Sequence, residues 1–177
     1  MPLRRIATAA LPAVTILCMA ILASMPWGAP LPVRFALPLL TLGCIDFWVL
    51  RRPRLVPSPV VFAAGLVTDL TTSGPLGYWT LMYLLGLAAC IHGPRLLTER
   101  LEGPLQMVQL IALVALVSFV GWLVTMVYFL RPMPMRPALL GGIVACGLYP
   151  VLAFLLAPLE TLIGRGEPVL SLIGEER

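Results

Sequence analysis

Six long runs of apolar residues, separated by short polar connections, are the feature that most constrains the fold of this chain. They cover approximately Ala7–Met25, Val33–Leu50, Val56–Leu70, Leu76–Ile91, Leu105–Leu130 and Ala138–Ile163. A helix needs about 20 mostly apolar residues to cross the hydrocarbon core of a bilayer. The third and fourth runs are shorter than this, and the fifth and sixth are longer. We therefore expect an all-α, polytopic membrane helical bundle of about six transmembrane helices, with residues 1–177 forming a single integral membrane domain.

The overall composition supports a membrane location. Hydrophobic residues make up 60% of the chain and charged residues only 11%, and the mean hydropathy is +0.99. So few polar residues cannot cover the surface of a soluble domain. The net charge of +4 is modest and gives no indication of nucleic acid binding.

The first apolar run follows two arginines, as the core of a signal peptide does. At about 19 residues it is longer than a usual signal core of roughly 7–15 residues. We therefore expect an uncleaved first span.

Arginines are distributed unequally between the connections on the two sides of such a bundle. One side would carry Arg4, Arg5, Arg51, Arg52, Arg54, Arg95, Arg100, Arg165 and Arg177. The other side would carry only Arg34, Arg131 and Arg136. Because cytoplasmic loops are enriched in basic residues, this bias predicts that both termini are cytoplasmic.

Aromatic residues stand near the ends of several runs, where a belt at the membrane surface is expected. We assign this belt role to Trp27, Trp48, Tyr78, Trp79 and Tyr128.

Asp69 is the most informative ionisable residue, because it ends an apolar run and precedes a turn rich in small residues. Gly65 lies four residues earlier on the same helix face and would let a neighbouring helix approach closely. After Asp69, Ser73 or Gly74 is a plausible N-cap for the next span, and Pro75 suits a helix start. The favoured interpretation is that Asp69 accepts hydrogen bonds from this turn and from the first amides of the next span, fixing a hairpin. A proton relay or a cation site is the alternative.

The other acidic residues and the histidine have simpler interpretations. Asp46 is expected to form an interfacial ion pair with Arg51 or Arg52, and Glu160 to pair with Arg165. His92 is interpreted as a residue at a span boundary.

No pattern of catalytic or cofactor-binding residues stands out. The chain lacks a Gly-x-Ser-x-Gly elbow, a His-Glu-x-x-His helix and a phosphate-binding loop. The four cysteines are isolated and are expected to act as small buried apolar residues; they are Cys18, Cys44, Cys90 and Cys146. We therefore predict a protein that is not an enzyme and has no cofactor or metal site. Small residues at 63–65 and 141–145 predict close helix packing.

The order of these features resembles the rod shape-determining MreD family of bacteria. In that family an Arg-Pro pair precedes a span ending in Gly-Leu-x-x-Asp-Leu, and a short turn with Pro-Leu-Gly follows. The corresponding residues here are Arg52-Pro53, Gly65–Leu70 and Ser73–Gly77. The resemblance makes Gly65, Asp69, Ser73, Gly74, Pro75 and Gly77 a motif that supports structure or partner binding.

The resemblance implies a non-enzymatic role in the inner membrane. MreD-like proteins belong to the complex that directs lateral wall growth, where they associate with the periplasmic scaffold MreC. The complex also includes the MreB filament, whose contact is direct or indirect, and the peptidoglycan synthases RodA and its penicillin-binding partner. The family's bundle is similar to the substrate-binding subunits of energy-coupling-factor transporters. A small-molecule-binding subunit of a membrane transporter is therefore the alternative function.

Overall fold

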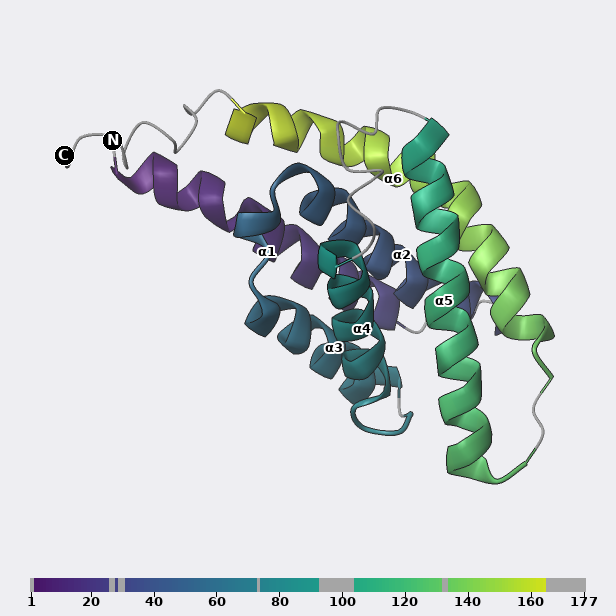
Figure 1. Cartoon of the computed structure of the whole chain (residues 1–177). Helices are drawn as coiled ribbons and strands as arrows, with labels where there is room; N and C mark the ends of the chain where they lie inside the picture. Colours follow the sequence, from purple (N-terminus) through teal and green to yellow (C-terminus); the bar gives the residue numbers. More distant parts are fainter. Residues whose placement is uncertain are drawn as a thin grey trace.

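The computed structural model of the chain is all-helical in the part it describes, which comprises residues 2–25, 28, 31–72, 74–92, 104–131 and 134–164. Its elements are α1 (Pro2–Ser24), α2 (Leu31–Arg51), a short 3-10 helix η1 (Pro53–Leu55), α3 (Ser58–Thr72), α4 (Tyr78–His92), α5 (Pro104–Phe129) and α6 (Arg136–Gly164). These described residues include no strand, so the predicted fold class is confirmed at the level of an all-α protein. Each of the six apolar runs corresponds to one helix (Figure 1).

Among the described residues, only two helices, α5 and α6, are long and apolar enough to cross a membrane by length and composition alone. Helices α3 and α4 have 15 residues each. At 1.5 Å per residue such a helix is about 22 Å long, shorter than a hydrocarbon core of about 30 Å. The described apolar part of α1, Ala10–Ser24, is equally short. Six membrane crossings therefore remain a prediction.

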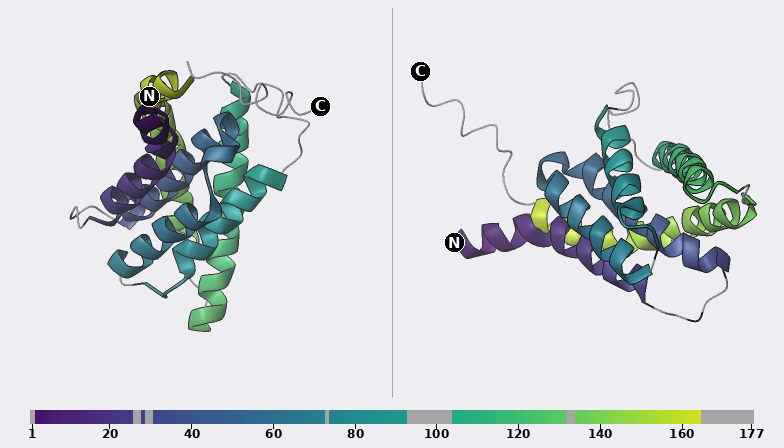
Figure 2. Two further views of the ribbon diagram at one scale, coloured as in Figure 1. Left: turned by 90° about the vertical axis from the view of Figure 1, so that its left-hand side faces the viewer. Right: turned by 90° about the horizontal axis from the view of Figure 1, so that it is seen from below.

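Helix α2 occupies the centre of the molecule. It packs against α1, α4, α5 and α6, and residues 38–49 are all buried. Helices α3 and α4 lie side by side as a hairpin, and α5 and α6 lie together on another side of α2 (Figures 1 and 2). A helix that is apolar on all faces is suited to such a covered position.

The central position of α2 contradicts the belt assignment of Trp48. This side chain is 0% exposed, and its Nε1 donates a hydrogen bond to Thr15 Oγ1 at 2.9 Å. Trp79 is also buried, at 9% exposure, whereas Tyr128 is 63% exposed. Trp27 lies outside the described residues. The neighbouring helices therefore decide which of these rings are covered.

Small residues allow close packing where the sequence predicted it. A Cβ on Gly142 of α6 would lie 3.2 Å from Cγ1 of Val114 in α5. Helix α6 bends along its length (Figure 1). Pro150 and Pro158 lie inside it, and each removes one backbone donor, which explains the bend.

The cysteines follow the prediction only in part. Cys44 is buried, Cys90 and Cys146 are half-buried, and none of the four forms a disulfide. Cys18 is exposed, so its assignment as a buried residue was wrong. It lies on a face of α1 that no other described helix covers.

Candidate functional site

The carboxylate of Asp69 organises the hairpin between α3 and α4. Asp69 is 1% exposed. Its Oδ1 accepts a hydrogen bond from the backbone N–H of Trp79 at 2.7 Å. Its Oδ2 accepts bonds from the N–H of Gly77 at 3.0 Å and from the N–H of Thr80 at 3.1 Å. The hydroxyl of Thr80 donates a further bond to Oδ2 at 2.8 Å.

These contacts satisfy the exposed amides at the start of α4. The first amides of a helix have no partner within the helix and need other acceptors. Tyr78 N–H, the remaining amide of this turn, donates to the carbonyl of Pro75 at 3.2 Å. The first bond within the helix then runs from Leu81 N–H to the Gly77 carbonyl at 2.8 Å. A side chain of α3 therefore caps α4, and the hydrogen bonds expected of Asp69 are present.

Gly65 lets the two helices of the hairpin meet at backbone distance. A Cβ built on Gly65 would collide with the Cα of Thr80 and would lie 2.8 Å from its backbone nitrogen. Gly65 and Asp69 therefore contact the same residue of α4. The close approach brings the carboxylate within hydrogen-bonding distance of the amides.

The turn residues contribute differently from the prediction. Helix α4 begins at Tyr78, so Gly77 occupies the N-cap position and Gly74 does not. Gly77 adopts φ +92°, a backbone conformation that residues with a Cβ rarely adopt. Pro75 supplies the carbonyl for Tyr78 and precedes the helix start. Ser73 lies outside the described residues.

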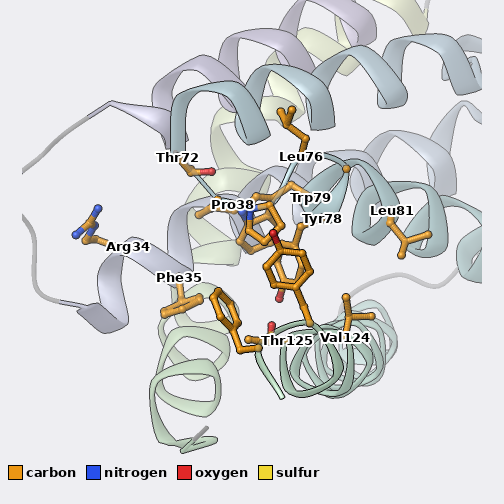
Figure 3. Close-up of a pocket in the computed structure, with 15 residues that line it drawn as sticks. Arg34, Phe35, Pro38, Thr72, Leu76, Tyr78, Trp79, Leu81, Val124 and Thr125 are labelled. Carbon is orange, nitrogen blue, oxygen red and sulfur yellow. The ribbon is translucent and has the colours of Figure 1, made fainter. Parts of the chain in front are cut away.

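An open apolar pocket lies beside this turn (Figure 3). Its volume is about 590 Å³, and it is bounded by the start of α2, the α3–α4 turn and the end of α5. Its lining includes Arg34, Phe35, Tyr78, Trp79, Thr125 and Tyr128. A second cavity of about 240 Å³ shares several of these walls and extends toward the start of α6. The starts of α2, α4 and α6 and the ends of α3 and α5 therefore meet at this end of the molecule, which we call the hairpin end.

A buried polar cluster lies toward the opposite end, where sequence reasoning expected only interfacial ion pairs. Asp46 is 0% exposed. Its Oδ1 accepts hydrogen bonds from Gln109 Nε2 at 3.2 Å and from Cys90 Sγ at 3.4 Å. Its Oδ2 is buried and has no hydrogen-bond partner among the described residues. The predicted pairing of Asp46 with Arg51 or Arg52 is therefore wrong.

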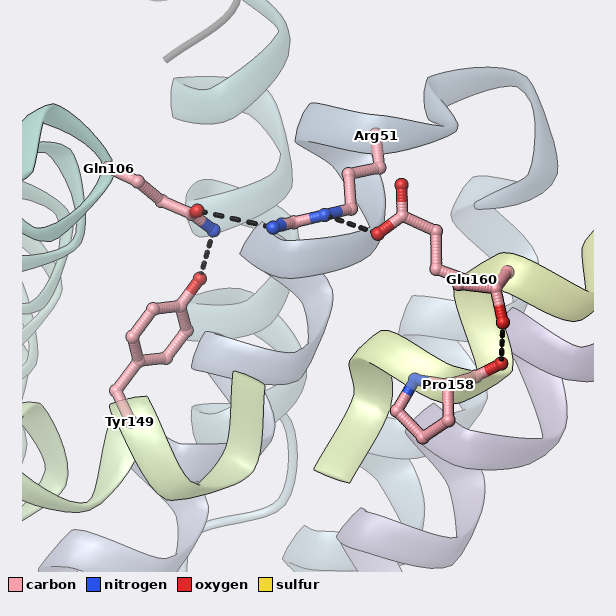
Figure 4. A network of polar contacts seen from close by, with 6 residues as sticks. Arg51, Gln106, Tyr149, Pro158 and Glu160 are labelled. Atoms are coloured by element: carbon pink, nitrogen blue, oxygen red, sulfur yellow. Dashed lines mark hydrogen bonds and ion pairs between the residues drawn. The ribbon is translucent and has the colours of Figure 1, made fainter. Parts of the chain in front are cut away.

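Arg51 instead forms an ion pair with Glu160 of α6, its Nε lying 2.7 Å from Oε2 (Figure 4). Arg51 also lies 3.9 Å from the centroid of the Phe47 ring and donates a hydrogen bond to Gln106 Oε1 at 3.4 Å. Gln106 Nε2 in turn donates to the hydroxyl of Tyr149. Glu160 was expected to pair with Arg165, which lies outside the described residues. The network joins the ends of α2 and α6 to the start of α5.

The signal for this second cluster was present in the sequence. Gln106 and Gln109 are three residues apart in an apolar helix and lie on one face of α5. Two amides in such a position need buried polar partners, and Asp46 and Tyr149 are polar residues of other apolar runs that can provide them. His92 is exposed at the last residue of α4, as expected of a boundary residue.

The described part of the chain shows hydrogen bonding and close packing around Asp69 and Asp46. Both carboxylate oxygens of Asp69 accept hydrogen bonds within the hairpin. Within the described ranges, no group of three or more His, Cys, Asp or Glu side chains could hold a metal ion. Comparison with known proteins found no matching protein family, curated protein or solved structure.

Proposed function

We propose that this chain is a non-enzymatic inner-membrane component of the bacterial cell-wall elongation complex, as its resemblance to the MreD family implies. The observation that carries the proposal is the α3–α4 hairpin. Gly65, Asp69, Pro75 and Gly77, which belong to the resembling motif, form one hydrogen-bonded and closely packed unit. A hairpin fixed by these contacts suits a protein that holds partners.

The proposal includes a six-span topology with both termini in the cytoplasm. Arg34, Tyr78 and Tyr128 meet at the hairpin end, while Arg51 and Glu160 meet at the opposite end. Helix ends are therefore grouped as alternating crossings would group them. The arginine bias then assigns the end with Arg51 to the cytoplasm.

The expected partner is a scaffold of the MreC type, with the RodA-like and penicillin-binding synthases and the MreB filament in the same assembly. The outer face of α3 is the surface best placed for its transmembrane helix. Phe62, Leu66 and Leu70 follow one another at four-residue intervals and are 49%, 39% and 64% exposed. They lie on the helix that Asp69 anchors, so the hairpin fixes the orientation of this face.

The first test is a pull-down of the tagged protein from its native membrane, followed by mass spectrometry. We expect to recover the scaffold and the synthases. Phe62→Ala should reduce recovery of the scaffold, whereas Phe154→Ala, which changes a 79% exposed ring on α6, should not. Absence of the scaffold from the wild-type sample would refute the proposal.

Topology is tested separately with reporter fusions. A fluorescent protein fused to the C-terminus should fluoresce, and alkaline phosphatase fused after Leu130 should be active, because that connection is expected outside the cytoplasm. The reverse pattern would exclude the proposed orientation.

The pocket at the hairpin end favours a second candidate, a small-molecule-binding subunit of a membrane transporter. Its volume of about 590 Å³ falls within the range of roughly 300–1,000 Å³ found for ligand sites. Recovery of an ATPase pair and a bound small molecule in the same pull-down would favour this candidate over the first.

A further inference from the structure

Arg34 is a cation in an unusual position. It lies in the first turn of α2 and is exposed. The helix dipole favours negative charge at a helix N-terminus and disfavours a cation there. No acidic residue lies in this turn, and the described residues provide no ion pair for Arg34. An anion bound at this position would interact favourably with both the guanidinium and the helix terminus.

The pocket of about 590 Å³ begins beside Arg34 and continues as an apolar surface (Figure 3). Phe35, Trp79 and Tyr128 contribute aromatic walls, and Leu81 and Val124 aliphatic ones. Among the described residues that line it, Arg34 is the only charged one. The site thus has a positive rim and an apolar body, which matches a molecule with an anionic head and a hydrocarbon tail.

The start of α4 does not offer a competing anion site. Its amides already donate to the carboxylate of Asp69, which also brings a negative charge close to the turn. An anionic group therefore has its favourable contact on the α2 side of the pocket, at Arg34.

The pocket is too small for a helical peptide of useful length. A helix with its side chains is about 10 Å wide and rises 1.5 Å per residue, so a volume of about 590 Å³ holds only roughly five helical residues. A flexible acyl chain fits this volume without that restriction.

We propose that this pocket binds one membrane phospholipid with an anionic headgroup, its phosphate beside Arg34 and an acyl chain along Phe35, Tyr78 and Tyr128. The inference rests on the membrane location in the proposed function, but not on the proposed partners. The bound lipid would fill the space between α2, the α3–α4 turn and α5.

The test is native mass spectrometry of the full chain in detergent, titrated with a palmitoyl-oleoyl phosphatidylglycerol or with the phosphatidylethanolamine of the same chains. One basic side chain near a lipid surface contributes about 1 kcal/mol, which corresponds to roughly fivefold in affinity. We expect phosphatidylglycerol to bind about fivefold more tightly, and Arg34→Gln to remove this preference. Arg131→Gln removes an exposed cation that does not line the pocket, and should leave the preference unchanged.

The acyl-chain site is tested by filling it. Thr125→Trp places a large ring in the pocket and should lower the affinity for both lipids at least fivefold. Leu123→Trp, on the same helix but outside the pocket, should have little effect. Circular dichroism establishes that the variants keep their helical content.

Equal affinity for the two lipids, or equal effects of Arg34→Gln and Arg131→Gln, would overturn the proposal. Displacement of the lipid by inorganic phosphate would show a phosphate site in place of a lipid site. Carbonate washing of native membranes distinguishes failure of the lipid-site proposal from failure of the proposed function. Release of the protein by the wash would refute its membrane location, whereas retention without selective lipid binding would refute only the lipid site.

Discussion

Replacing Asp69 by alanine should destabilise the protein more than any other single polar substitution in the described part of the chain. The change removes the acceptor for three backbone amides, and two of these belong to the buried residues Trp79 and Thr80. A buried donor left without a partner costs about 1–3 kcal/mol. Two such donors would therefore lower the free energy of unfolding by about 2–6 kcal/mol. Loss of an ordinary helix cap that water can reach lowers it by only about 0.5–2 kcal/mol. We expect a loss of about 3 kcal/mol.

Asp69→Asn refines this expectation. One oxygen remains, and it can replace Oδ2, which accepts three of the four bonds. The amide nitrogen then faces the N–H of Trp79, so that contact is lost. We expect roughly half the loss seen with alanine, about 1–2 kcal/mol, because one buried amide loses its acceptor.

The assay is reversible unfolding in mixed micelles at rising dodecyl sulfate, followed by the helical circular dichroism signal. Thr71→Ala is the matched control, because the Thr71 hydroxyl bonds only to carbonyls of its own helix, Val67 and Thr68. A loss below about 0.5 kcal/mol for Asp69→Ala, smaller than that of an ordinary cap, would refute the capping argument. Equal losses for Asp69→Ala and Thr71→Ala would do the same.

Three further predictions use the same unfolding assay. Gly65→Ala should cost about 1–3 kcal/mol by overpacking against Thr80, while Gly147→Ala, with open space around it, should be neutral or stabilising; equal effects would refute this. In a double-mutant cycle, Arg51→Ala and Glu160→Gln should show a coupling of about 0.5–1 kcal/mol, since the ion pair is partly exposed; zero coupling would contradict the pairing. Asp46→Asn should leave stability unchanged or raise it, because Oδ1 remains as acceptor and a buried charge with an unpaired oxygen is removed; a loss like that of Asp69→Asn would show that the charge is needed.

The two aspartates show how far sequence reasoning could reach. The partners of Asp69 lie 8 to 11 residues further along the chain, in a turn whose composition is visible beside it. The partners of Asp46 lie 44 and 63 residues away. Arg51 is close to Asp46 in the sequence and was therefore an expected partner, but in the fold Arg51 pairs with Glu160. Local chemistry was therefore predictable, whereas contacts between distant helices depended on the packing of the bundle.

The buried face of each helix could not be predicted from the sequence, for a related reason. In lipid, the solvent that our proposal gives this chain, an outer face is as apolar as an inner one, so apolar residues do not mark the interior. Helix α2 is covered on all sides, whereas most of α5 is exposed or half-buried, although both are apolar. Polar side chains do mark the inner face, because each of them needs a partner there. On α5, Gln106 and Gln109 face the central helix, and Asp46 marks α2 as that helix. The few polar residues inside an apolar run are therefore better guides to helix packing than the many apolar ones.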